Sequence, residues 1–215
     1  RNQHEAFGYN SLNGQVIPNG IDVKGFSFSS ALRQKVRSKL CIPEDAFVIG
    51  HVARLHPMKN HPLFFKVAVA LAQRHLRTQF ILCGQGISLS NSVLEKLVPL
   101  EIRDRFHLLD ERSDVSEIMC AMAIFCLSSA WGEGFPNVIG EAMAIGLPCV
   151  ATDVGDSSII IGKTGVVVPP CNEEALFSGI ESLIAMPNEQ RRALSLSAQD
   201  RINANYTLGE IVKKY

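Results

Sequence analysis

The sequence has no net charge, because 21 lysines and arginines balance 21 aspartates and glutamates. Without a basic excess there is no bulk field to attract nucleic acid, so any polyanionic ligand must be held by a local site. Also missing are an apolar run of the roughly 20 residues that span a bilayer and a signal-peptide layout at the start. These absences predict a soluble globular protein with no nucleic-acid partner.

Cysteine pairing is absent as well. None of the six cysteines lies in a C-x-x-C pair, and several lie in apolar runs where a reduced thiol packs as a small hydrophobe. No Cys/His spacing suggests a bound metal. The pattern favours a reducing cytoplasm, and the missing initial methionine favours a fragment of a longer protein.

What the sequence does contain is an alternation of short β-branched segments with longer segments of helical period, which is typical of βαβ units. The predicted strands are 47–54, 78–83, 105–109, 123–127, 148–152 and 165–168, and the predicted helices lie near 61–75, 90–97, 115–121, 136–145 and 173–186. We predict an α/β fold with one doubly wound, Rossmann-like parallel sheet of about six strands, covered on both faces. Ligands should bind beyond the carboxyl ends of its strands.

The two ends of the chain differ from this middle part, which we place at 46–187. Residues 1–45 should form an interdomain segment with the first elements: a short edge strand at 16–22, a turn, and a charged helix near 32–40. Residues 188–215 should form an amphipathic helical segment.

Two glycine motifs do not meet the requirements of a phosphate loop. Before Gly162-Lys-Thr164 the required first glycine is replaced by Ser157, and a strand-like segment follows where a helix is needed. Gly84-Gln-Gly86 lacks a third glycine and predicts a turn that lets something approach closely.

A better-defined motif follows the fourth strand. Pro136 and Gly146 mark the start and the end of a helix, which puts Glu133 in the preceding loop and Glu141 on the helix. The glycines beside Glu133 let backbone N–H groups reach a ligand, and a helix N-terminus favours an anion such as pyrophosphate. Carboxylates accept hydrogen bonds from sugar hydroxyls. The alternative is that each glutamate is an ordinary solvated acid.

Two cations, Arg54 and Lys59, end the first strand, and Asn60 can cap the next helix. Beyond the carboxyl edge of a sheet, in a chain without net charge, they suggest a phosphate clamp. The alternative is a solvated surface pair.

Together, Val16-Ile-Pro-Asn-Gly-Ile-Asp22, Arg54-x4-Lys59, Glu133-x7-Glu141 and Gly165-Val-Val-Val-Pro resemble the C-terminal domain of family 4 glycosyltransferases. The resemblance covers nearly the whole chain, and the glutamate motif within Gly-Glu-Gly-Phe-Pro is highly specific. The most similar members are bacterial enzymes that build surface polysaccharides such as lipopolysaccharide or capsule.

This resemblance implies one half of a two-domain GT-B enzyme. Residues 46–187 would bind a nucleotide-sugar, and a glycan or lipid-linked acceptor would bind an N-terminal domain that this chain lacks. The family moves a hexose or hexosamine with retained anomeric configuration, usually without a metal, by front-face departure and attack. No cofactor is implied beyond the nucleotide-sugar substrate. The full-length enzyme would be cytoplasmic, with room for a peripheral place at the inner face of the membrane.

The resemblance also assigns residues. Arg54 and Lys59 would hold the donor pyrophosphate, Glu133 the sugar and Glu141 the nucleotide ribose, which makes the first three the catalytic candidates. The loop at 109–114 would border the base. The other donor contacts would be Gly84, Arg112, Gly134, Phe135, Pro136, Asn137 and Val138.

Two positions depart from the family pattern. Asp110 stands where members often have glycine, which would put a carboxylate near the base, and Ala123 stands where they often have aspartate. Two alternatives therefore stay open: a GT-B sugar-nucleotide epimerase, and a non-catalytic nucleotide-sugar-binding module.

Overall fold

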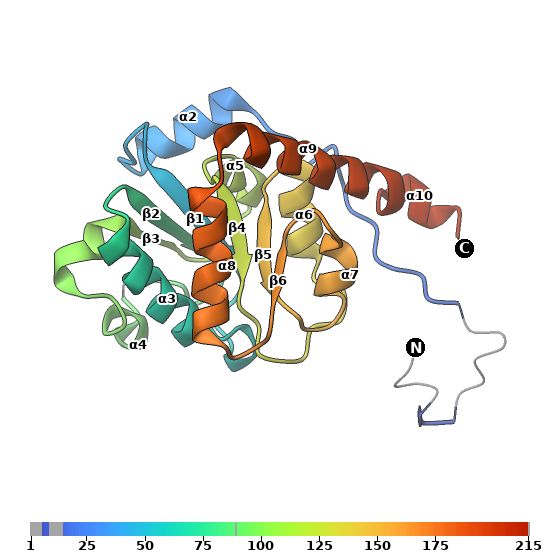
Figure 1. Ribbon diagram of the computed structural model, residues 1–215, viewed down its shortest axis with the longest axis horizontal. Helices are drawn as coiled ribbons and strands as arrows, with labels where there is room; N and C mark the ends of the chain where they lie inside the picture. Colours follow the sequence, from blue (N-terminus) through green and yellow to red (C-terminus); the bar gives the residue numbers. More distant parts are fainter. Residues whose placement is uncertain (1–5, 9–14, 89, 215) are drawn as a thin grey trace.

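The fold is a single six-stranded parallel sheet between helices, in a computed structural model that describes residues 6–8, 15–88 and 90–214 (Figure 1). The strand order is β3-β2-β1-β4-β5-β6. The strands are β1 (Phe47–Val52), β2 (Thr78–Cys83), β3 (Phe106–Leu109), β4 (Ile124–Leu127), β5 (Cys149–Thr152) and β6 (Val166–Val168). This order is that of a doubly wound sheet whose winding reverses between β1 and β4. The predicted fold class is confirmed.

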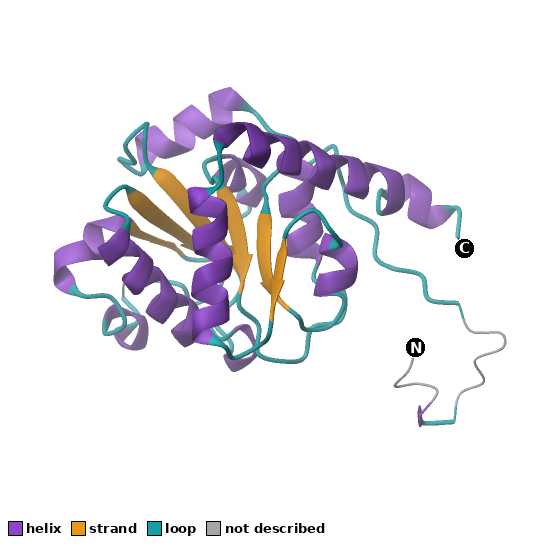
Figure 2. Cartoon of the chain, in the orientation of Figure 1, coloured by secondary structure: helices purple, strands orange, loops and turns teal. Residues whose placement is uncertain are grey.

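Helices cover both faces of the sheet (Figure 2). The reason is that side chains alternate along each strand: Val48 of β1 packs into one core and Ile49 into the other. The core at Ile49 is shared with α3 and α8, and the core at Val48 with α5 and α6. The helices named in the described part of the chain are α2 (Ser30–Lys39), α3 (His61–Arg74), α4 (Ser92–Glu95), α5 (Val115–Cys120), α6 (Asn137–Ile145), α7 (Ser157–Ile161), α8 (Glu173–Ala185), α9 (Asn188–Asn205) and α10 (Leu208–Val212). The 3-10 helices η2 (Pro57–Lys59) and η3 (Leu100–Arg105) lie between them.

The predicted edge strand at 16–22 is wrong. Residues 15–20 form no strand, and Ile21 alone makes a bridge, with Thr207. The Ile21 N–H donates to the Tyr206 carbonyl at 2.7 Å, and the Leu208 N–H donates to the Ile21 carbonyl at 3.3 Å. The ladder stops there because α10 begins at Leu208, so the chain that could pair with Ile21 becomes helical.

The C-terminal tail is helical, as predicted, and consists of two helices, α9 and α10. The break falls at Tyr206 and Thr207, where the Thr207 hydroxyl oxygen accepts from the Glu210 N–H at 3.2 Å and caps α10. Tyr206 is buried and its ring lies 5.7 Å from that of Phe135. The tail therefore packs against the loop that carries the predicted glutamate motif.

Among the residues that the structure describes, no helix combines the length and the apolar character needed to cross a bilayer.

Candidate functional site

The loops after β1 and β4 meet beyond the carboxyl edge of the sheet, where a doubly wound sheet forms its crevice. Lys59 enters from η2 and Glu133 from the loop between β4 and α6. The Lys59 Nζ lies 2.5 Å from the Glu133 Oε1, and the two side chains are 14% and 7% exposed. They are thus a mostly buried ion pair, not solvated surface residues.

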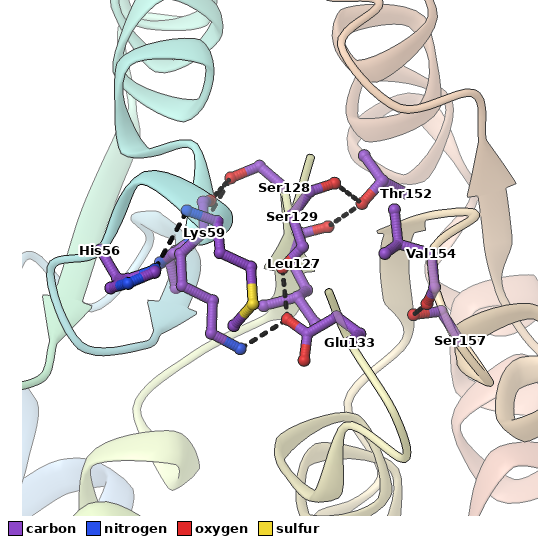
Figure 3. Close-up of polar contacts among 11 residues, drawn as sticks. His56, Lys59, Leu127, Ser128, Ser129, Glu133, Thr152, Val154 and Ser157 are labelled. Atoms are coloured by element: carbon purple, nitrogen blue, oxygen red, sulfur yellow. Dashed lines mark hydrogen bonds and ion pairs between the residues drawn. The ribbon is translucent and has the colours of Figure 1, made fainter. Parts of the chain in front are cut away.

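Hydroxyl groups at the ends of neighbouring strands extend this pair into a network (Figure 3). The Ser129 Oγ donates to the same Glu133 Oε1 at 2.5 Å. Thr152, the last residue of β5, donates through its Oγ1 to the Ser129 carbonyl at 2.6 Å. Lys59 from η2 and Ser129 from the loop after β4 therefore converge on one carboxylate oxygen, and Thr152 of β5 supports Ser129.

The turn that carries Lys59 is supported from inside the protein. The Ser128 Oγ donates to the Lys59 carbonyl at 2.9 Å and lies 3.3 Å from the Asn60 carbonyl. Because this hydroxyl proton is used, the Nε2–H of buried His51 is the donor to Ser128 Oγ, at 3.2 Å. Asn60 itself has a φ of 50° and leads into α3.

Two buried histidines lie beneath this turn, His51 on β1 and His61 at the start of α3, with ring centroids 4.8 Å apart. Burial, followed by the nearby His61 and Lys59, holds the pKa of His51 well below its ordinary value. Burial likewise lowers the pKa of His61 to about 4. Both rings are therefore neutral at pH 7.

Arg54 is exposed just beyond β1 and bonds through its side chain to none of the described residues. The next residue, Leu55, donates its N–H to the Gln85 carbonyl at 2.8 Å, which joins this loop to the turn after β2. In that turn Gly84 has a φ of 148°, and a Cβ there would overlap the Ala53 carbonyl oxygen. The close approach predicted at Gly84 is thus made by the chain's own backbone.

Glu141 lies on α6 in a different setting. The helix runs from Asn137, after Pro136, to Ile145, and Gly146 with a φ of 91° follows as its C-cap, so the predicted boundaries hold to within one residue. The Glu141 side chain is half-buried and accepts no hydrogen bond from the part of the chain that the structure describes. Burial raises the pKa of its carboxyl group.

The loop between Glu133 and α6 divides into inward and outward residues. Phe135 and Val138 pack against the core, and Pro136 is buried. Gly134 is exposed with open space around it, and Asn137 is exposed and accepts a hydrogen bond from the Asn19 side chain at 3.0 Å. Of the residues from Gly134 to Val138, Gly134 and Asn137 are thus the two that are exposed.

The loop after β3 holds its charges in internal contacts. Arg112 forms a fork with Asp114, at 2.8 Å from Nε and 2.6 Å from Nη2, which lowers the pKa of Asp114. The Asp110 Oδ1 accepts from the backbone N–H groups of Gly86 at 2.8 Å and Glu111 at 2.9 Å. Asp110 therefore joins the turns after β2 and β3.

Sequence reasoning did not identify Ser128, Ser129, Thr152 or Asn19. A signal existed for the first three, because they are hydroxyl residues at the carboxyl ends of β4 and β5, on the edge where a ligand site was expected. Residues 6–8, 15–88 and 90–214 contain no group of three or more His, Cys, Asp or Glu side chains placed to hold a metal ion.

Comparisons with known proteins agree with this picture. The family model described as glycosyl transferases group 1 matches residues 46–186. The chain is 33% identical to the putative glycosyltransferase EpsF of Bacillus subtilis over 138 residues, which cover 64% of this chain and 35% of EpsF. It is 30% identical over 151 residues to the UDP-Gal:alpha-D-GlcNAc-diphosphoundecaprenol alpha-1,3-galactosyltransferase of Escherichia coli, covering 68% of this chain and 38% of that protein. The chain thus spans little more than a third of either relative.

Solved structures match over nearly the whole chain. HepE of Anabaena in complex with UDP-glucose superposes with a TM-score of 0.84 at 26% identity, over 98% of this chain and 58% of HepE. The C-terminal domain of LpcC, a glycosyl transferase group 1 family protein of Francisella tularensis, shares the fold with a TM-score of 0.73 at 19% identity, over 88% of this chain and 100% of that domain.

Proposed function

The chain belongs to the group 1 glycosyl transferases, as the C-terminal domain of a family 4 enzyme of the GT-B fold, and from this premise we propose that it binds the nucleotide-sugar donor. The whole enzyme would transfer a hexose or hexosamine with retained configuration. Residues 46–187 would form the binding domain, with 1–45 as the interdomain entry segment and 188–215 as a C-terminal helical segment.

The observation that carries this proposal is the buried Lys59–Glu133 pair beyond the carboxyl ends of β1 and β4. An ammonium group has three N–H donors, so Lys59 can keep Glu133 and still donate to a phosphate oxygen. Arg54 lies near the start of the same loop, just after β1, and its guanidinium group bonds to none of the described residues. A diphosphate bound beyond these strand ends would meet both cations, and the match to HepE in complex with UDP and with UDP-glucose supports that ligand class.

The two glutamates would serve the two ends of the donor. Glu133 lies beside Lys59, so its carboxylate would accept from hydroxyls of the transferred sugar. Glu141, further along α6, would accept hydrogen bonds from the ribose diol. Its carboxylate accepts none from the described residues, so it remains able to bind a ligand. The N-terminus of α6 favours the negative charge between them.

In the proposed reaction, the bond between the anomeric carbon and the diphosphate oxygen breaks, and an acceptor hydroxyl oxygen bonds to that carbon on the same face. The hydroxyl proton passes to the leaving phosphate. Arg54 and Lys59 stabilise the charge that develops on the diphosphate, which is the role a metal has in other transferases.

The acceptor would be a glycan or lipid-linked sugar in the synthesis of a surface polysaccharide such as lipopolysaccharide or capsule. The Escherichia coli relative, whose name includes a diphosphoundecaprenol acceptor, supports this class. An N-terminal domain would bind the acceptor. The full-length enzyme would be cytoplasmic, at or near the inner face of the membrane.

The test is a thermal-shift screen of the 215-residue chain with UDP, GDP, ADP and their glucose conjugates. A ligand that binds the native state raises the Tm, and we expect at least one base to do so with both of its ligands. The same chain should transfer no sugar to any acceptor, because catalysis needs both domains to position the reactants. A Tm unchanged by all six compounds would overturn the proposed binding.

A further inference from the structure

The two carboxylate oxygens of Glu133 are used unequally. Both Lys59 Nζ and Ser129 Oγ donate to Oε1, each at 2.5 Å, while no described residue donates to Oε2 (Figure 3). A carboxylate offers about four lone-pair sites on its two oxygens. Oε2 is therefore the oxygen left to accept from a ligand, and the contacts on Oε1 determine where Oε2 points.

Ser129 lies in the loop after β4, and burial and hydrogen bonding hold it in place. It is 0% exposed, and its carbonyl accepts the 2.6 Å hydrogen bond from Thr152, which is itself buried at the end of β5. Two adjacent strands thus position the hydroxyl that donates to Glu133.

The backbone of Glu133 is supported from the other side by the loop after β5. Gly155 has a φ of 60°, and a Cβ at this position would overlap the carbonyl oxygens of Glu133 and Gly134. The Asp156 N–H donates to the Gly134 carbonyl at 2.9 Å. Because the backbone is held here, rotation of the Glu133 side chain is the main freedom left, and Ser129 restricts it.

We propose that Ser129 is a positioning residue for the sugar of the donor: its hydroxyl holds Oε1 of Glu133 so that Oε2 faces the sugar hydroxyls. The inference rests on the proposed function. Lys59 would interact with two groups at once, because its ammonium group is paired with Glu133 and is also attracted to a bound diphosphate. Ser129 has no such competing ligand, so its hydroxyl group positions Glu133 whether or not the donor is bound.

The test compares Ser129→Ala with the wild-type chain in calorimetric titrations with UDP and UDP-glucose, or with the guanosine or adenosine pair if that pair gives the larger thermal shift. We expect the sugar-nucleotide to bind about tenfold more weakly to the variant, because a hydrogen bond to a charged group is lost. Binding of the free diphosphate should not change. A defect of packing alone would weaken both ligands alike.

Ser157→Ala is the matched control. Ser157 is also buried, at the start of α7, and its Oγ donates to the Val154 carbonyl at 2.7 Å, so the substitution removes a similar bond without touching a carboxylate. Neither affinity should change, and thermal unfolding of both variants measures any loss of stability.

A double-mutant cycle separates an action through Glu133 from an independent one. In a Glu133→Ala background, Ser129→Ala should have no further effect on the sugar-nucleotide. Additive losses, or an unchanged affinity of Ser129→Ala for the sugar-nucleotide, would overturn the inference while leaving the proposed function intact. If the wild-type chain binds neither member of any pair, both proposals fail together.

Discussion

Glu133 and Glu141 belong to one motif, yet the fold gives them opposite environments. Glu133 is 7% exposed and holds two hydrogen-bond donors on one oxygen, whereas Glu141 is half-buried without a described donor and with a raised pKa. One carboxylate is therefore organised before any ligand arrives, and the other is left for the ligand to satisfy. The first arrangement suits a group that must be oriented for chemistry, and the second suits a group that only binds.

The largest effect should come from breaking the Lys59–Glu133 ion pair. Lys59→Met leaves the Glu133 carboxylate buried with only Ser129, and we expect the free energy of unfolding to fall by about 3 kcal/mol, because an uncompensated buried charge is costly. Urea unfolding at pH 7 measures this loss. The double variant Lys59→Met/Glu133→Gln should recover part of it, and an equal or larger loss in the double variant would contradict the assigned pairing.

The buried histidines beneath the turn that carries Lys59 should make the stability of the protein sensitive to acid. Since the pKa of His61 is about 4 in the folded protein against 6.5 unfolded, the unfolded chain binds more protons as the pH falls. Stability should therefore decrease between pH 6.5 and about 4, by about 3 kcal/mol for this residue. Urea unfolding of the wild type and of His61→Leu across this range gives the difference. A parallel decline in both would show that His61 is not responsible.

Two exposed arginines sharpen the comparison between free and engaged charges. Arg54→Ala should weaken binding of UDP, or of the diphosphate preferred in the thermal screen, by about 1.5–3 kcal/mol through the loss of charge-assisted hydrogen bonds. Arg112→Ala should cost less, because Arg112 is already forked to Asp114. Calorimetric titration of both variants is the measurement, and a larger loss at Arg112 would reverse their assigned roles.

The smallest effect should be a change in stability when Glu141, the glutamate without a described donor, is substituted. Burial raises the pKa of Glu141, so its charged form is disfavoured in the folded state and stability declines as the pH rises past 4.5. Glu141→Gln should thus be slightly more stable than the wild type at pH 7, and the gain should disappear at pH 4. Urea unfolding at the two pH values measures it, and a less stable variant at pH 7 would indicate that Glu141 has a structural partner.

The fold was largely predictable from local pattern. Among the six strands of the sheet the largest difference is two residues, 47–54 against Phe47–Val52, because strand and helix periods are read directly from apolar spacing. The helix α7 was not predicted, because Ser157-Ser-Ile-Ile-Ile161 is rich in β-branched residues that favour strands. Burial of Ile160 and Ile161 in the core overrides that preference.

The sequence predicted which residues lie near the site but not which of them contact one another. Lys59 and Glu133 were predicted from motifs, but their pairing joins residues 74 positions apart and exists only because β1 and β4 are neighbours in the sheet. Ser129 and Thr152 act through single hydroxyl groups that no sequence period marks. The sequence predicted a carboxylate of Asp110 near the base. It could not show that this carboxylate accepts from the Gly86 N–H, because that bond depends on how the loops after β2 and β3 meet.

The most direct test of the division between the two glutamates is a set of four affinities, those of Glu133→Gln and Glu141→Gln for a nucleoside diphosphate and for its sugar conjugate, each set against the wild type. UDP and UDP-glucose are the first probes, and the lone tryptophan, Trp131, is exposed two positions before Glu133 and can report binding by fluorescence. We predict that Glu141→Gln weakens both ligands alike, because both contain the ribose, and that Glu133→Gln weakens only the sugar conjugate. Equal losses for both ligands at Glu133, or no loss for either at Glu141, would contradict the account.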